Sequence, residues 1–397
     1  MPPPLEGLQI VDLTRVVAGP FCTMLLGDMG AEVIKVEEPR RGDEVRGWAP
    51  YLNGWSTYFL GLNRNKKSVA LDLKNPQGAE ALRRLIERAD VLVENLRPGS
   101  LTRLGFGFKE MEKLNSRLIY CSMSGYGNSG PRQGLPGYDV VIQGESGLMD
   151  VTGASDGPPT RVGIAISDYV AGLYAHLGIL LALADREKSG RGQHVDIALL
   201  DSIFSVMQLP VGILLATGTT PRRVGNQHPS VAPYEPLRAK DGEIIVAPGN
   251  PRLWKRFCTA IGRPDLTQDP RFSNNDLRLK YRSELRSILE SIFQNFSVDE
   301  LIHKFEKYEV PCGRVRSVAE AINDPQLLSR DMIVEMPHND LGIVKTLGNP
   351  VKLSRTPCSM RTPPPALGEH TEEVLAEIGL QTRHEKSNPA QKNPKDK

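Results

Sequence analysis

Hydrophobic and polar positions follow two alternating patterns over the first 125 residues of the chain. Short apolar runs of strand length are separated by stretches in which apolar residues recur at helical spacing. The runs predict strands and the periodic stretches predict helices. The expected strands are Leu8–Leu13, Glu32–Glu37, Ser68–Leu73, Val91–Glu94 and Leu118–Met123, and the expected helices are Phe21–Met29 and Pro76–Arg88. Strands that alternate with helices indicate a parallel sheet covered by helices.

Composition changes near Pro221–Pro236, a stretch rich in Pro, Arg and polar residues. A second strand–helix pattern follows it. We therefore predict an α/β protein with a large Rossmann-like domain and a smaller α/β domain. The predicted parts are a large-domain N-terminal part at 1–220, a small domain at 225–330, a return linker with the C-terminal part of the large domain at 331–380, and a disordered tail at 381–397, which lacks apolar residues.

The overall composition is that of a soluble globular protein, with 397 residues, 40% hydrophobic and 24% charged. A net charge of +2 implies no bulk attraction to nucleic acid or to an anionic membrane. No continuous apolar run approaches the roughly 20 residues of a membrane span. Five scattered cysteines without a CxxC motif favour a reducing compartment, so we expect a cytoplasmic protein. The histidines show no metal-ligand spacing, and no metal site is expected.

Asp168 is the main candidate for chemistry. A short apolar run ends at Ser167–Asp168, and a long amphipathic helix is expected to begin there. The positive end of a helix favours an ionised carboxylate. Such a carboxylate can serve as a nucleophile, and with an ordinary pKa near ~4 it is ionised at neutral pH. The alternative is that Asp168 is an ordinary helix N-cap.

The segment Gly125–Gly130 matches the GxGxxG pattern and follows a predicted strand. Pro131, Gly134, Pro136 and Gly137 follow it, so no helix opens there to receive a pyrophosphate. The pattern therefore indicates a loop beside a site rather than a dinucleotide cofactor.

Basic residues are frequent in the first 103 residues, and several follow the predicted ends of strands. Open α/β sheets bind ligands at those ends. Arg97 and Arg103, for example, follow the strand that ends at Glu94. Such residues could hold an anionic, phosphate-bearing ligand, or could form an ordinary solvated face.

Several segments taken together are more specific than any one of them, and in this order they resemble the class III CoA-transferase family. That family includes formyl-CoA transferase and carnitine CoA-transferase, and the likeness is strongest to succinyl-CoA:glutarate CoA-transferases. The resemblance runs from about Leu5 to Leu380. The segments that carry it are Leu5–Pro20, Leu26–Glu37, Asn63–Ser68, Glu94–Gly99, Ser124–Gly127, the Asp168 segment and Leu367–Thr371.

The resemblance implies that Asp168 attacks an acyl-CoA thioester, giving an aspartyl anhydride and then an aspartyl-CoA thioester. The implied partners are an acyl-CoA donor, succinyl-CoA in the first instance, and a small acceptor acid, a C4–C5 dicarboxylate. CoA is then part of the substrate, and no permanently bound cofactor is expected. The family forms interlocked homodimers, and the same is expected here.

The resemblance also assigns CoA contacts. The residues expected to bind CoA are Arg15, Val16, Val17, Ala18, Arg40, Leu71, Lys74, Asn95, Leu96, Arg97, Arg103 and Tyr138. The family has an Arg at the position of Glu38. Arg40, two residues later in the sequence, is expected to take over the role of that Arg. Val17 replaces a Gln of formyl-CoA transferase, which argues against oxalate-type specificity.

Four further residues are expected near the acyl group or the acceptor acid. Gly249 and Asn250 fall where formyl-CoA transferase has a run of glycines, and Trp48 matches a Trp that packs near that run. Arg46 is the expected partner of the free carboxylate of a dicarboxylate. Its alternative role is a structural ion pair with Asp43 or Glu44.

Two other functions are compatible with parts of this pattern. An α-methylacyl-CoA racemase uses an acid–base pair to move a proton. Tyr138 and Asn250 stand here at the positions of that pair, so the pair is missing. The other alternative is a CoA-binding protein without turnover, in which Asp168 only caps a helix.

Overall fold

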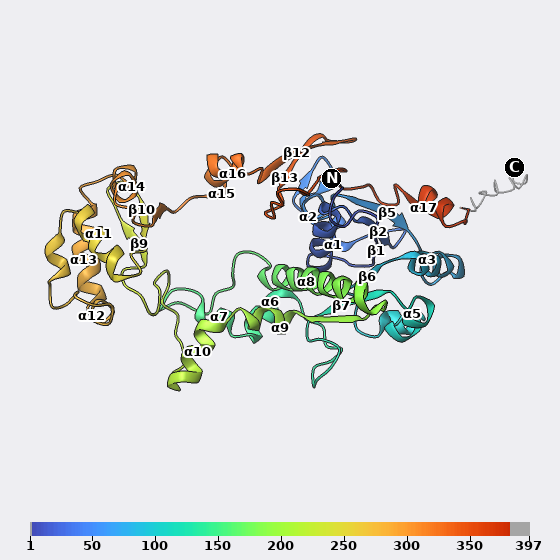
Figure 1. Cartoon of the computed structure of the whole chain (residues 1–397), viewed down its shortest axis with the longest axis horizontal. Coiled ribbons are helices and arrows are strands. Elements are labelled where there is room, and N and C mark those ends of the chain that lie inside the picture. The colour runs from blue at the N-terminus through green and yellow to red at the C-terminus, as the bar shows by residue number, and fades with distance from the viewer. Residues whose placement is uncertain (1, 382–397) are drawn as a thin grey trace, which may run out of the picture. The chain divides into compact units, whose positions relative to one another are not determined.

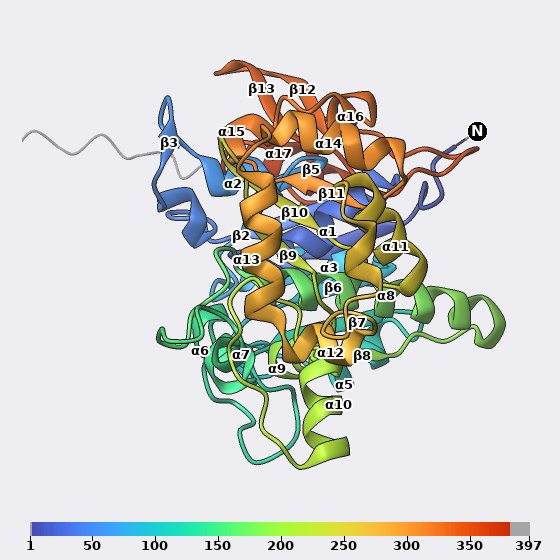
Figure 2. The same ribbon diagram turned by 90° about the vertical axis from the view of Figure 1, so that its left-hand side faces the viewer.

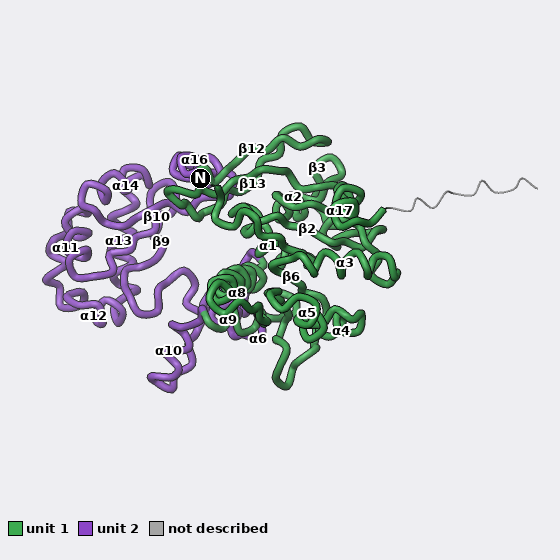
Figure 3. Tube along the Cα trace, turned by 45° about the vertical axis from the view of Figure 1, so that its right-hand side comes forward, with its two compact units in different colours: residues 1–142, 165–205, 331–397 green, residues 143–164, 206–330 purple. Residues whose placement is uncertain are grey.

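The computed structural model describes residues 2–381, and these fall into two compact units (Figure 3). Unit 1 comprises residues 2–142, 165–205 and 331–381, and unit 2 comprises residues 143–164 and 206–330. This division places 143–164 and 206–220 with the smaller unit, whereas the sequence analysis expected them in the large domain. The predicted disordered tail lies outside the described residues, except for residue 381.

Unit 1 is built on a six-stranded parallel sheet with strand order β5-β2-β1-β6-β7-β8. Strands β5, β2, β1, β6 and β7 are labelled in Figure 1. The register is continuous, with Asp12 beside Lys35 and Glu94 beside Ser122. From β1 the chain adds β2 and then β5 toward one edge of the sheet. From β6 it adds β7 and then β8 toward the other edge. The strands are β1 (Gln9–Asp12), β2 (Glu32–Glu37), β5 (Lys66–Ala70), β6 (Val91–Glu94), β7 (Ile119–Ser124) and β8 (His194–Ala198).

One face of this sheet carries a large apolar core cluster of unit 1. Val11, Ile34, Val69 and Leu92 point to this face and pack against the helices α3 (Pro76–Arg88), α5 (Phe108–Leu114) and α17 (Thr371–Glu377). Because side chains alternate along a strand, the intervening residues point to the other face. Several of these are charged and buried: Asp12, Lys35, Glu37 and Lys66.

Helices α1 (Ala18–Asp28) and α8 (Ile166–Ser189) pack against each other in unit 1 (Figure 1). Their contact is close at Gly172, where a Cβ would lie 2.7 Å from the carbonyl oxygen of Ala18. The rings of Phe21 and Tyr169 meet edge to face with centroids 5.0 Å apart. α8 is also long and apolar enough to cross a membrane by length and composition alone, a property also found in core helices of soluble proteins.

Short elements complete unit 1 around this framework. They are η1 (Glu44–Gly47), β3 (Tyr51–Leu52), β4 (Trp55–Ser56), α2 (Thr57–Leu62), α4 (Ser100–Arg103), α9 (Leu199–Ser205), β12 (Ile333–His338) and β13 (Gly342–Leu347). Helix α6 (Asp139–Glu145) runs from unit 1 into unit 2.

Unit 2 contains a three-stranded antiparallel sheet with order β11-β10-β9. Helix α13 packs against β9 (Figure 2). Phe257, Phe293 and Phe305 are fully buried in the core between these elements. The elements of unit 2 are α7 (Leu148–Val151), α10 (Gln208–Thr217), β9 (Glu235–Arg238), β10 (Glu243–Val246), α11 (Pro251–Ala260), η2 (Pro264–Thr267), α12 (Asn275–Lys280), α13 (Arg282–Phe293), α14 (Val298–Lys307), β11 (Cys312–Arg314), α15 (Val318–Ala321) and α16 (Pro325–Ser329).

The predicted α/β class with a parallel sheet is confirmed. The predicted helix Pro76–Arg88 and strands Glu32–Glu37 and Val91–Glu94 have the predicted bounds. Helix α1 begins at Ala18, three residues before the predicted start, because Ala18–Pro20 already takes helical geometry. Proline is well tolerated in a first helical turn.

Candidate active site

Asp168 lies in the wall of a cavity of about 500 Å³ in unit 1. The other walls come from the turn after β1, the loop after β6 and the end of β7. These segments all leave the carboxyl edge of the parallel sheet, and β1 and β6 are the neighbours between which the direction of chain winding reverses. Open α/β sheets bind ligands at such a switch point.

Asp168 is the third residue of α8 and is not its N-cap. The N-cap position is Ala165, which makes no side-chain capping bond. The interpretation of Asp168 as an ordinary N-cap is therefore wrong. The first turn is instead anchored by Asp139, whose Oδ1 accepts a hydrogen bond of 2.9 Å from the backbone N–H of Ser167. Asp168 remains free to point into the cavity that it lines.

The surroundings of Asp168 oppose its ionisation. Burial, with a further contribution from the negative charge of Asp139, raises the pKa of Asp168 to about 7. The expectation of an ordinary carboxyl pKa near ~4 is therefore wrong. Neutral and ionised forms of this carboxyl group are both populated near neutral pH.

The turn between β1 and α1 has an unusual backbone. Val16 adopts a φ of 68°, in the left-handed region that β-branched residues rarely enter. Such a conformation costs roughly 1–3 kcal/mol and persists only where the surroundings impose it. Here the Val16 N–H donates to Asp43 Oδ1 at 3.0 Å. The Asn95 side chain holds Arg15 by two hydrogen bonds, accepting from its N–H and donating to its carbonyl, each at 2.8 Å.

The cavity brings together nine of the residues that the sequence analysis selected. It joins Asp168 to the turn after β1, to the loop after β6 and to Tyr138, which is 61% exposed. The residues so placed are Arg15, Val16, Val17, Ala18, Asn95, Leu96, Arg97, Tyr138 and Asp168.

Four of the expected CoA contacts do not line this cavity. Arg40, Lys74 and Arg103 are exposed elsewhere on unit 1, although Arg103 donates a 3.1 Å hydrogen bond to Ser100, which does line it. The side chain of Leu71 lies in the apolar core, so only its backbone is available for contact with a ligand.

The expected role of Arg46 is not supported by its contacts. Its guanidinium group donates to both carboxylate oxygens of Glu37, at 2.8 and 2.7 Å, and to the carbonyl of Pro365. It also stacks on Phe59. These contacts favour the alternative role of Arg46 in a structural ion pair, but its partner is Glu37 rather than Asp43 or Glu44. Arg46 lines a separate cavity of about 180 Å³.

The remaining three acyl-site candidates lie outside the Asp168 cavity. Trp48 packs edge to face with Tyr58. Gly249 and Asn250 belong to unit 2, where Asn250 caps α11 by accepting a hydrogen bond from Leu253 N–H at 2.9 Å.

The GxGxxG pattern has a structural explanation. A Cβ on Gly125 would lie 2.8 Å from the Cα of Gly137, so the two backbone segments can approach only with glycine there. Both residues line the cavity. The sequence analysis correctly placed this loop beside a site but did not select the cavity residues Glu44, Ser124 and Leu199, which carry no motif of their own.

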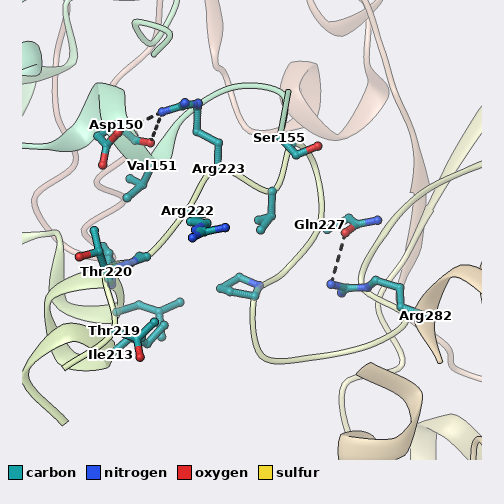
Figure 4. Close-up of a pocket in the computed structure, with 16 residues that line it drawn as sticks. Asp150, Val151, Ser155, Ile213, Thr219, Thr220, Arg222, Arg223, Gln227 and Arg282 are labelled. Carbon is teal, nitrogen blue, oxygen red and sulfur yellow. Dashed lines mark hydrogen bonds and ion pairs between the residues drawn. The ribbon is translucent and has the colours of Figure 1, made fainter. Parts of the chain in front are cut away.

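Unit 2 contains a larger cavity of about 990 Å³ (Figure 4). Arg223 is paired there with Asp150 at 3.0 Å, and Arg282 with Gln227. None of the residues expected to act in the site lines this cavity. Within residues 2–381 no cluster of three or more His, Cys, Asp or Glu side chains could hold a metal ion.

The raised pKa predicts a pH dependence. If ionised Asp168 is the nucleophile, kcat/KM should rise with pH to half its plateau near pH 7, because the reactive form exists above the pKa and is lost below it. Asp139→Asn removes the neighbouring negative charge and keeps an oxygen to accept from Ser167, so the midpoint should move to lower pH. The measurement is kcat/KM from about pH 5 to about pH 9 for both proteins. An unchanged midpoint in the variant would contradict this electrostatic account.

Comparison with known proteins gives one consistent result. Residues 5–371 match the model of CoA-transferase family III. The succinyl-CoA:glutarate CoA-transferase of Mus musculus is 39% identical, over 94% of this chain and 86% of its own length. The acetyl-CoA:oxalate CoA-transferase of Acetobacter aceti is 41% identical, over 88% of this chain and 89% of its own length.

The fold comparison agrees with the sequence comparison. The crystal structure of a CaiB/BaiF family protein from Brucella suis is similar with a TM-score of 0.84 and 37% identity, over 95% of this chain and 100% of that one. With the family match covering nearly the whole chain, this protein belongs to CoA-transferase family III and is an enzyme.

Proposed function

We propose that this enzyme moves CoA from succinyl-CoA to a C4–C5 dicarboxylic acid, with Asp168 as the nucleophile. The observation that carries the proposal is the position of Asp168. Asp168 lines a cavity at the sheet switch point together with the turn and the loop that the resemblance assigns to CoA, and this arrangement supports its attack on a thioester.

The first half of the reaction moves CoA onto the enzyme. The Asp168 carboxylate attacks the thioester carbonyl, the C–S bond breaks and CoA leaves as a thiolate, which gives a mixed anhydride. The thiolate then attacks the Asp168 carbonyl of that anhydride. The donor acid leaves as a carboxylate, and Asp168 carries CoA as a thioester.

The second half reverses these steps with the acceptor. The acceptor carboxylate attacks the Asp168 thioester and releases the thiolate, giving a new anhydride. The thiolate attacks the acceptor carbonyl, which forms the product acyl-CoA and frees the Asp168 carboxylate. Charge and atoms balance at each step, and no net proton transfer is needed.

Each attack places negative charge on a carbonyl oxygen, and hydrogen-bond donors should stabilise it. The first N–H groups of a helix have no partner within the helix. Val17 and Ala18, at the beginning of α1, lie in the cavity wall with Asp168. We propose their N–H groups as donors to the developing oxyanion.

The dicarboxylate part of the proposal is supported by the relatives. Glutarate, oxalate, mesaconate and citramalate appear among the acids that the similar transferases are named for. A second carboxylate needs a cationic partner. Since Arg46 is bound to Glu37, we propose Arg15 in its place. Arg15 lines the cavity, and its nearest ion-pair partner, Glu44, is 4.0 Å away.

Asp168→Asn should remove exchange, with a loss of kcat of about a thousandfold or more. Binding of free CoA should be retained, because the charge removed is not in the expected nucleotide contacts. The unfolding free energy should not fall, because Asp168 is no helix cap and its repulsion with Asp139 is relieved. The measurements are steady-state exchange, calorimetric CoA binding and urea unfolding. Asp201→Asn, a first-turn Asp of α9 that does not line the cavity, is the matched control. Exchange by Asp168→Asn at the control rate would reject the nucleophile.

Acceptor preference can be measured with acids matched in carbon number. With succinyl-CoA as donor, glutarate should be converted to its CoA ester with a kcat/KM about tenfold or more above that of valerate, because valerate leaves the cationic partner unpaired. Product esters are followed by mass spectrometry, with oxalate and mesaconate as further acceptors. Equal conversion of valerate and glutarate would contradict the dicarboxylate assignment.

We also propose an interlocked homodimer. Leu173, Leu177 and Leu181 lie four residues apart on α8, form one stripe and are 51%, 48% and 62% exposed. An apolar stripe of this kind is suited to an interface with a second copy.

Light scattering should therefore give twice the 43.8 kDa mass of the chain. Leu177→Glu combined with Leu181→Glu should lower that mass, because a charge would be buried without a partner. Ile343→Glu, at a position 63% exposed on β13, is the control. A wild-type mass of one chain would reject the dimer.

A further inference from the structure

One face of the sheet of unit 1 carries a group of buried charged residues. Strand alternation directs Asp12, Lys35, Glu37 and Lys66 away from the apolar core, toward the opposite face. All four are at most 5% exposed. Asp43, which is 1% exposed, joins them from the segment after β2.

Lys35 connects this face to the strained turn. Its Nζ donates to the carbonyl of Thr14 at 2.7 Å and to Asp43 Oδ2 at 2.9 Å. The other oxygen of Asp43 accepts the N–H of Val16, the residue in the left-handed conformation. One buried lysine and one buried carboxylate therefore hold the backbone on both sides of Arg15.

Stability alone does not explain these charges. A buried ion pair is often no more stabilising than apolar residues of the same volume. Apolar residues, however, could not satisfy the Thr14 carbonyl and the Val16 N–H, and an unpaired buried backbone group is costly. The pair thus supplies what the turn specifically requires: a donor and an acceptor at fixed positions.

The network continues to the segment Leu367–Thr371. Glu37 Oε2 accepts the N–H of Asp43 at 2.9 Å, and Glu37 Oε1 accepts from the Ser68 hydroxyl at 2.6 Å. The Ser68 hydroxyl in turn accepts the N–H of Gly368 at 2.9 Å. A run of hydrogen bonds therefore joins the C-terminal segment to the turn at the cavity.

We propose that Lys35 and Asp43 are positioning residues for the transfer reaction. They hold Val16 in its left-handed conformation and so place the N–H groups of Val17 and Ala18 opposite Asp168. The inference rests on the proposed function, because it takes the cavity of Asp168 as the site of transfer. Neither residue lines that cavity, so each acts through the turn.

Lys35→Met is the main test, since it keeps an unbranched side chain that is shorter by one atom and removes both hydrogen bonds. In folded protein kcat should fall about tenfold or more, as expected when a reacting geometry shifts by a fraction of an ångström. The fall in kcat should exceed the change in the KM for acyl-CoA.

A second substitution separates positioning from general damage. Glycine takes positive φ without strain, so Val16→Gly relieves the conformation that the pair enforces. For each background, the kcat of the protein that carries Val16→Gly is divided by the kcat of the protein that does not. This ratio should be about fivefold larger in the Lys35→Met background than in the wild-type background. Equal ratios in the two backgrounds would overturn the proposal.

Arg64→Met is the matched control. Arg64 and Asp28 form another buried ion pair of unit 1, 2.6 Å apart, that makes no contact with the turn. This variant should lose stability in thermal unfolding, as Lys35→Met does, yet keep its kcat. A loss of kcat in the control equal to that of Lys35→Met would also overturn the proposal.

Asp43→Asn covers the case in which Lys35→Met does not fold. It retains an oxygen for the Val16 N–H but loses the ion pair, so kcat should fall and Val16→Gly should again compensate.

The assay uses succinyl-CoA with glutarate and with oxalate. A wild-type enzyme inactive with both acids, yet binding CoA, would count against the proposed substrates. In that case weaker CoA binding by Asp43→Asn than by Arg64→Met would support the positioning role, and equal binding would reject it.

Discussion

The constraint on which unit 1 depends is the position of strand β1 between β2 and β6. Parallel strands end at one edge of a sheet, and here the chain winds away from β1 in one direction and away from β6 in the other. The loops that follow these two strands therefore separate and leave a cavity between them. Asn95 ties the loop after β6 back to Arg15 by two hydrogen bonds, so the two walls are held at a fixed separation.

The same sheet has two faces with different physical roles. One face is apolar and packs against α3, α5 and α17, as expected for a core driven by burial of hydrocarbon. The other carries buried apolar residues such as Ile10 and Val33 and, among them, paired charges that are nearly as inaccessible to water. Because a hydrogen bond has a preferred direction and a hydrophobic contact does not, the hydrogen bonds of the charged side chains can impose a backbone conformation that Val16 would otherwise avoid.

Asp168 combines exposure to the cavity with an environment that raises its pKa. The α8 N-terminus favours the anion, but burial and the neighbouring Asp139 outweigh it. This balance comes from residues that are 29 positions apart in the sequence and meet only where α6 and α8 begin.

Relatives of similar identity are named for oxalate and for glutarate, so the choice of acid is expected to depend on a few side chains in the cavity rather than on the fold.

The sequence by itself determined the α/β class, several elements to the residue and the family, and it selected Asp168 as the candidate for the chemistry. These are local or cumulative signals: apolar periodicity, and motifs whose order survives along the chain. Only the tertiary structure decided that Asp168 is not a cap, that Leu71 is in the core and that Arg46 is bound to Glu37. The need of a free carboxylate for a cationic partner pointed to Arg46 as a substrate ligand, but the sequence does not show which carboxylate lies nearest to it. Partner choice, burial and pKa depend on side chains brought together from distant segments, and no local pattern in the chain carries that information.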